Sequence, residues 1–214
     1  RSPAEQLELL LGSISAHARA GDAMTARSQQ HIAVRTATAL GDEDQLVKAL
    51  AAWDAPLVWR VREQGTISPE LLDPLRRLLR EGTMPQGVRI SLLCALFREI
   101  EGEDDDEVLR TSGYALDRAR AEGDPRLLCE ALNVRTYAAL GPDLADQRDA
   151  LAAELLEVAT EAGLVDYQAV AHWLLFLAAA ARTRLVDAKQ HVDQAVALSS
   201  SGQLGHLLGV IGIF

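Results

Sequence analysis

Short glycine-containing turn sequences divide this chain into segments of about 20 residues. Glycine readily ends a helix because it adopts the left-handed conformation without steric cost, and an aspartate that follows it can cap the next helix. Gly41-Asp42 and Gly123-Asp124 have this form. The stops fall at Gly21, Gly41, Gly82, Gly102, Gly123, Gly141, Gly163, around Arg184, and at Gly202. Because the gap between Gly41 and Gly82 is about double, we expect two helices in it.

The spacing of these stops predicts the fold class. One helix per about 20 residues gives one helical hairpin per about 40, close to the 34 residues of a tetratricopeptide unit and the 40–47 of HEAT or armadillo units. Antiparallel helices joined by short turns stack and bury a continuous core. We therefore expect an all-α fold, a right-handed α-solenoid of antiparallel helical hairpins that is tetratricopeptide-like, in a single domain over residues 1–214.

Local start and stop signals place the individual helices. The first opens on the capping box Ser2-Pro3-Ala4-Glu5 and runs to about Ala20, and Ser68-Pro69-Glu70 caps a later one. Asp54-Ala55-Pro56 should break the chain into an irregular segment near 54–67. The other helices are expected at 23–40, 43–53, 68–81, 85–101, 107–122, 125–140, 144–162, 164–183, 186–200 and from 204 onward. The chain starts without methionine and finishes on an apolar run, which we interpret as a fragment of a larger regulator.

Composition limits the partners that we expect. The formal net charge is −10, whereas phosphate binding needs clustered Lys and Arg, so direct nucleic-acid binding is not expected. The longest apolar run, Trp173 to Ala181, is far shorter than the ~20 residues of a membrane span. Cys94 and Cys129 each lie in an apolar helical run and are expected to be reduced core residues. These features predict a cytoplasmic protein without a membrane partner.

No sequence motif supplies catalytic chemistry. Gly82 to Arg89 has the glycines of a phosphate loop but has Val-Arg in place of Lys-Ser/Thr. Glu101 to Glu107 lacks the glycine and the distal glutamate of a calcium loop. The five histidines are scattered over different expected helices, and there is no Cys-x-x-Cys pair for zinc. We therefore expect no enzyme activity, no metal and no cofactor.

The helix that follows Asp124 carries four candidate binding residues. Arg135 lies on its apolar arc, where it either forms a structural ion pair, as a buried charge requires, or acts as an anion hook. Glu130, Asn133 and Tyr137 form a polar stripe at i, i+3 and i+7. That stripe is either a solvated face or a surface that contacts a ligand or a peptide.

Aromatic residues give the remaining candidates. Trp53 and Trp59 flank the expected break, and they either fill the core or wall a pocket. His172 lies on a polar strip of the most apolar expected helix, whereas Trp173 lies away from that helix's main apolar face. Packing on two sides explains this arrangement, and a ligand contact is the alternative.

Two segments resemble a known family. The first runs from Ala39-Leu40-Gly41-Asp42 to Trp53-Asp54-Ala55-Pro56-Leu57-Val58-Trp59-Arg60, and the second, Leu128 to Asp143, contains Ala131-Leu132-Asn133-Val134-Arg135 and Gly141-Pro142-Asp143. Together they resemble the C-terminal helical-repeat region of large actinobacterial antibiotic regulatory proteins, which have a bacterial transcriptional activator domain, and of their relatives with an ATPase domain.

The resemblance implies a regulatory role in antibiotic biosynthesis. In this family a winged helix binds promoter DNA, an ATPase domain follows, and the repeat region senses a signal or holds the regulator in one state. The main hypothesis is a regulatory domain of a transcriptional activator that binds a small effector or its own DNA-binding and ATPase domains. The alternative is a protein-interaction scaffold that mediates homo-oligomerisation without an effector.

Overall fold

The computed structural model describes residues 3–58, 67–202 and 204–213. These residues form eleven α-helices and one 3₁₀ turn without any strand, which confirms the all-α prediction. The helices are α1 (Pro3–Ala20), α2 (Ala23–Leu40), α3 (Glu43–Ala51), α4 (Pro69–Glu81), α5 (Gln86–Ile100), α6 (Asp105–Glu122), α7 (Pro125–Ala138), α8 (Ala145–Glu161), α9 (Val165–Ala181), α10 (Leu185–Ser201) and α11 (Gly205–Ile211), with the 3₁₀ turn η1 at Pro142–Leu144. None of these helices is long and apolar enough to cross a bilayer.

Aspartate side chains cap four of the helices, as the turn sequences suggest. The Oδ1 atoms of Asp22, Asp42 and Asp104 each accept a hydrogen bond from the backbone N–H three residues later, at 3.1, 3.0 and 2.9 Å. Asp124 Oδ1 accepts two such bonds at the start of α7. Each cap satisfies backbone donors that have no partner within the helix, and this fixes where the next helix begins.

Several predicted boundaries were wrong. Ser68 precedes α4 but makes no side-chain cap, and Ser2 of the predicted capping box lies outside the described residues. Residues 105 and 106, predicted as loop, belong to α6, because the Asp104 cap starts that helix and its dipole favours acidic residues in the first turn. α7 ends at Ala138 instead of about 140, since Pro142 favours the extended conformation of Gly141 that the structure contains.

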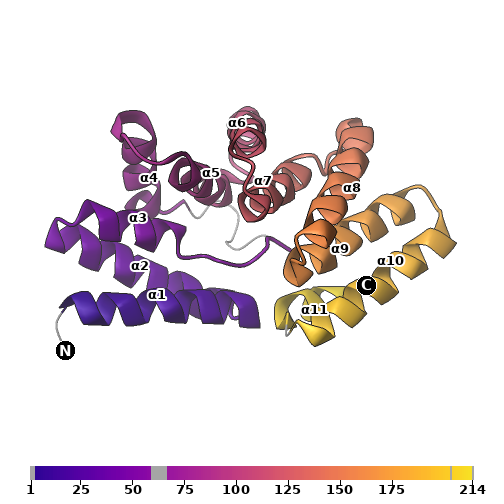
Figure 1. The fold of residues 1–214 in the computed structure, drawn as a ribbon, viewed down its shortest axis with the longest axis horizontal. Coiled ribbons are helices and arrows are strands. Elements are labelled where there is room, and N and C mark those ends of the chain that lie inside the picture. Colours follow the sequence, from indigo (N-terminus) through magenta and orange to yellow (C-terminus); the bar gives the residue numbers. More distant parts are fainter. Residues whose placement is uncertain (1–2, 59–66, 203, 214) are drawn as a thin grey trace.

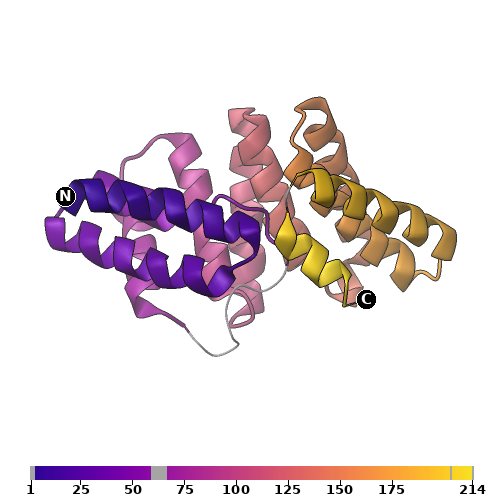
Figure 2. The ribbon, with the colours of Figure 1, turned by 90° about the horizontal axis from the view of Figure 1, so that it is seen from below.

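Within the described residues, helices that are adjacent in sequence pack against each other, except that α4 packs against α2 and α5 rather than closely against α3. Figure 1 shows that they follow an arc, which brings the first and last helices, α1 and α11, next to each other. α1 contacts α11, and the same two helices lie side by side in the turned view of Figure 2. A Cβ placed on Gly21 would lie 2.8 Å from His206, and one on Gly205 would lie 2.9 Å from the Ala20 carbonyl oxygen. Glycine is therefore required on both sides of this contact.

Two large hydrophobic clusters form the core, and α5 belongs to both. Leu92 and Ala95 of α5 pack with α1 to α4. Phe97 and Cys94 pack with the C-terminal helices. Because α5 is covered on both sides, even its polar residues Arg98 and Glu99 are buried. Cys94 and Cys129 are free and buried, as predicted, and burial raises the pKa of the Cys129 thiol to about 12.

The predicted break after α3 is an extended segment that crosses the inside of the arc (Figure 1). α3 ends at Ala51, two residues earlier than predicted, because Trp53 turns into a small cluster with Ala18 and Ala26. Further along, Leu57 and Val58 are only 2% and 4% exposed and join the larger hydrophobic cluster. The segment is therefore part of the hydrophobic core.

Candidate functional site

A groove of about 1220 Å³ lies between α2, α3 and α4. Its apolar lining comes from Val34 and Ala39 of α2, Leu46 of α3, and Pro69 and Pro74 of α4. α4 packs against α2 and α5, and Leu46 is the one residue of α3 that borders the groove, so the groove opens mainly between α2 and α4.

The rim of the groove is rich in arginine. Arg35 comes from α2, and Arg76, Arg77 and Arg80 come from α4, opposed by Glu70, Asp73 and Glu81. Three of these arginines form ion pairs: Arg35 with Glu70 at 3.4 Å, Arg76 with Glu107 at 2.9 Å, and Arg77 with Glu43 at 2.8 Å. Arg80 has no acidic partner within 4 Å among the described residues and is exposed. The groove thus combines an apolar floor with a charged rim of four arginines and three acidic residues.

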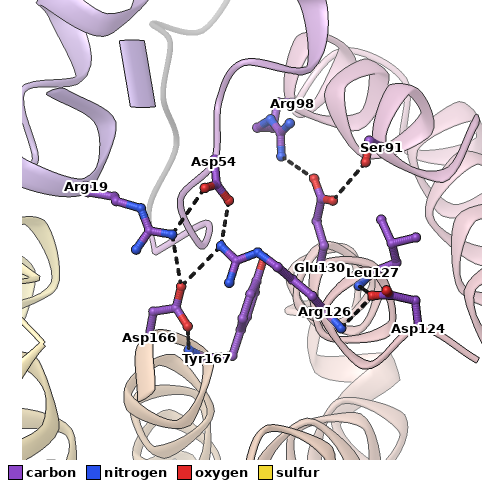
Figure 3. A network of polar contacts seen from close by, with 10 residues as sticks. All are labelled: Arg19, Asp54, Ser91, Arg98, Asp124, Arg126, Leu127, Glu130, Asp166 and Tyr167. Carbon is purple, nitrogen blue, oxygen red and sulfur yellow. Dashed lines mark hydrogen bonds and ion pairs between the residues drawn. The ribbon is translucent and has the colours of Figure 1, made fainter. Parts of the chain in front are cut away.

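The inner surface of the arc carries a second polar feature, centred on Asp54. Arg19 of α1 and Arg126 of α7 lie 3.2 and 2.6 Å from its two carboxylate oxygens (Figure 3). Asp166, near the start of α9, lies 3.6 and 3.5 Å from the same two guanidinium groups. Arg126 also sits over the Tyr167 ring. This network joins four chain segments that are far apart in sequence.

Two buried ion pairs lie farther along the same surface. Arg27 of α2 and Glu99 of α5 form a bidentate pair at 2.9 and 2.8 Å. Glu130 of α7 accepts long hydrogen bonds of 3.4 Å from Ser91 and Arg98 (Figure 3). Burial raises the pKa of the Glu130 carboxyl, and the charge of Arg98 opposes that shift.

Two small spaces border the charged residues on the described part of the inner surface. Its four arginines are matched by four carboxylates, Asp54, Glu99, Glu130 and Asp166. The spaces beside Arg98 and beside Pro56 measure about 10 and 20 Å³, which is the size of one water molecule. Among the described residues, these charges therefore connect helices, and the two spaces beside them are too small for an effector.

The polar stripe predicted on α7 is mostly buried, so the solvated-face interpretation was wrong. Asn133 is 1% exposed and forms two hydrogen bonds with the backbone of Leu57. Tyr137 is buried, which raises the pKa of its hydroxyl, and a hydrogen bond with Trp173 opposes that shift. Glu130, Asn133 and Tyr137 therefore all interact with other residues of the chain.

Arg135 forms hydrogen bonds with neutral groups and does not form the predicted structural ion pair. Its Nη1 donates to the Leu109 carbonyl at 2.8 Å and to the Ser112 hydroxyl at 3.3 Å, and its Nη2 lies 3.4 Å from Gln147 Oε1. No carboxylate of the described residues lies within 4 Å of it. Desolvation lowers the pKa of this guanidinium, and the charge of Asp117 opposes the shift. The predicted ion pair is therefore absent from the described part of the chain.

The aromatic candidates are core residues where the structure describes them. Trp53 is 7% exposed and packs on alanines of α1 and α2. Trp173 is fully buried and stacks on Phe176 at 5.2 Å between ring centroids. Trp59 lies outside the described residues. Neither described tryptophan lines the groove between α2 and α4.

His172 pairs with a residue that the sequence analysis left aside. Its Nδ1 lies 3.0 Å from Nδ1 of His191 on α10. Desolvation lowers the pKa of both imidazoles. No group of three or more His, Cys, Asp or Glu side chains in the described ranges could hold a metal ion.

Sequence reasoning missed the groove and the inner network. Asp54 was noted only as part of a helix break, and Arg19, Arg126 and Asp166 carried no motif. The one usable signal for the groove was the expected helix at 68–81, which has Arg76, Arg77 and Arg80 on one side. No family model, curated protein or solved structure matched this chain.

Proposed function

We propose that this chain is a regulatory helical-repeat domain that works by binding a segment of protein in the groove between α2, α3 and α4. The observation that carries this proposal is the groove itself, with an apolar floor and four arginines on its rim. An apolar floor between charged edges is the surface that receives one face of an amphipathic helix. The parent protein would be a transcriptional activator of secondary metabolism, a setting that rests on the family resemblance.

The size of the groove favours a protein segment over a small molecule. Pockets for drug-sized ligands typically measure about 300–1,000 Å³ and enclose most of the ligand. This groove, at about 1220 Å³, exceeds that range. A helix of three turns can lay an apolar stripe along it and leave its other side in solvent.

Charge complementarity defines the occupant. Arg80 has no acidic partner within the described ranges, and Arg35 and Arg77 sit in exposed pairs that contribute little to stability and exchange readily. We therefore expect an amphipathic helix that places an acidic residue against Arg80, beside its apolar stripe. The neighbouring domains that the resemblance implies, the DNA-binding and ATPase domains, are its expected source.

A peptide selection against the purified domain tests this proposal. A displayed library of about 16-residue helical peptides is selected on the wild type, and the winners are titrated against Arg80→Glu and against Arg110→Glu as the matched control. Arg110 is also exposed but lies on α6, outside the groove. We expect acidic amphipathic winners whose affinity falls about tenfold, or 1.4 kcal/mol, with Arg80→Glu and is unchanged with Arg110→Glu. Winners that lack acidic residues, or that bind both variants equally, would exclude the groove.

The alternative function, a scaffold that only mediates oligomerisation, makes a different prediction. Native mass spectrometry of the wild type should then give a multiple of the 23.1 kDa chain mass. The Arg80→Glu variant should give the mass of a single chain. A single-chain mass with the selected peptide added would favour the regulatory interaction domain.

A further inference from the structure

A small polar pocket between α6, α7 and α8 is separate from the groove. It measures about 390 Å³, within the range of small-ligand sites. Arg135 of α7 reaches it from one side, and Gly113, Asp117 and Arg120 of α6 line another. Gln147 and Glu154 of α8 complete the polar lining.

Arg135 brings a positive charge to this pocket, and no carboxylate of the described residues lies within 4 Å of it. One edge of its guanidinium is held by the Leu109 carbonyl and the Ser112 hydroxyl, which are neutral. The other edge meets only Gln147, at a long 3.4 Å. By contrast, the half-buried Arg126 has a carboxylate oxygen at 2.6 Å. A planar carboxylate fits a free guanidinium edge with two parallel hydrogen bonds.

Asp117 brings a negative charge that is equally unbalanced. No basic side chain of the described residues lies within 4 Å of it, and the nearby Arg120 is already held by Glu154 at 3.2 and 2.6 Å. The charge of Asp117 acts on Arg135, so the two free charges border the same space. The pocket is neutral as a whole, which disfavours a dianion such as phosphate.

Gly113 lines the pocket and places no side chain in it. Glycine in the middle of a helix costs about 1 kcal/mol relative to alanine, so its position in α6 needs a reason. A Cβ at this position would lie 3.9 Å from Nη1 of Arg135. A residue larger than alanine would therefore extend into the space beside the guanidinium.

We propose that this pocket binds a small zwitterion, an amino acid or a similar amino-carboxylate, with its carboxylate on Arg135 and its ammonium group on Asp117. Such a ligand gives each free charge a partner and leaves the pocket neutral. Gln147 is placed to hydrogen-bond the same carboxylate through its amide nitrogen once that side chain turns over. The proposal is independent of the groove, so either can fail without the other.

The test observes the Arg135 side chain directly. The NMR resonance of the Arg135 Nε–H group is assigned by its loss in Arg135→Gln. Its chemical shift is then followed during titration with each of the common amino acids. Acetate, which has only the carboxylate, and methylamine, which has only the ammonium group, are titrated at the same ionic strength as controls. We expect at least one amino acid to give a saturable shift with an affinity at least tenfold higher than that of acetate. Asp117→Asn should weaken that binding at least tenfold, and Arg110→Gln should leave it unchanged.

Three results would overturn the proposal. The first is the absence of a saturable shift with every amino acid. The second is acetate binding as tightly as the best amino acid, which would make the site a simple carboxylate site. The third is unaltered binding in Asp117→Asn, a variant of an exposed residue that should fold normally. A thermal melt of each variant checks that folding is retained.

Discussion

The side-chain amide of Asn133 binds Leu57 in the way that a neighbouring β-strand would. Its Oδ1 accepts the Leu57 N–H at 2.7 Å, and its Nδ2 donates to the Leu57 carbonyl at 3.0 Å. An extended segment inside a helical protein has no strand partner for its backbone groups, and a buried group without a partner is costly. One asparagine on α7 therefore makes the crossing of this segment through the interior possible.

Removing this amide should destabilise the fold. We expect Asn133→Ala to lower the free energy of unfolding by about 2–4 kcal/mol, because a buried donor and a buried acceptor both lose their partner. Urea denaturation of the variant against the wild type measures the loss. Gln194→Ala on the exposed side of α10 is the control and should change stability by less than about 0.5 kcal/mol. An equal loss in both variants would show that Asn133 has no special role.

The ion pairs of the inner surface should differ in strength according to their burial. Glu99 and Arg27 are 6% and 15% exposed, so Glu99→Ala leaves a buried arginine unpaired and should cost about 3–5 kcal/mol. Asp54 and Arg126 are 52% and 38% exposed, so solvent screens their pair and Asp54→Ala should cost about 1 kcal/mol or less. Chemical denaturation of both variants tests the order. A larger loss for Asp54→Ala would mean that its network holds α1 to α9 more strongly than its exposure indicates.

The contact between His172 and His191 should make the C-terminal helices sensitive to acid. At an Nδ1–Nδ1 distance of 3.0 Å one imidazole must donate and the other accept, which requires a neutral ring. Burial lowers the pKa of both rings; for His191 the charge of Asp187 opposes this shift and that of Arg184 adds to it. A depressed histidine pKa stabilises the fold above the unfolded value of about 6.5, and this contribution is lost as the pH falls through the lowered values.

Denaturation between about pH 7.5 and pH 5 measures this effect. The wild type should lose more stability over this range than the double variant His172→Gln/His191→Gln. His206, whose pKa burial also lowers, is retained in both proteins and cancels in the comparison. If the free energy of unfolding fell by the same amount with pH in both proteins, the prediction would be wrong.

Thr183 occupies a turn position that elsewhere in the chain belongs to glycine. Its φ is 57°, close to the 66° of Gly163 in the preceding turn. The left-handed conformation costs an L-residue about 1–2 kcal/mol, so Thr183→Gly should raise the free energy of unfolding by up to about 1 kcal/mol after the entropy of glycine is subtracted. Gly163→Ala should do the opposite. Thermal melts of the two variants give the comparison, and shifts of the same sign would refute the strain argument.

Much of the helical layout could be predicted because its causes are local. The residues that end and cap α2 lie within a few positions of its boundaries, and so the predicted span 23–40 coincides with the observed helix. The errors at α3, α6 and α7 are confined to a few residues near a proline or an acidic first turn. The crossing segment could be foreseen only as a break, since its path depends on Asn133, 76 positions away from Leu57.

The candidate sites depended on the tertiary structure for a different reason. Sequence spacing placed Arg135 on an apolar arc and Glu130, Asn133 and Tyr137 on one stripe, but it could not tell which groups would meet them. Arg135 has neutral partners because α6 presents a carbonyl and a hydroxyl there, and Asn133 meets a backbone that comes from outside its own hairpin. The helices could be predicted from the sequence alone, because caps and breaks act over a few residues. The positions of the groove, the pocket and the inner charges follow from tertiary packing, because each combines side chains from several helices that packing brings together.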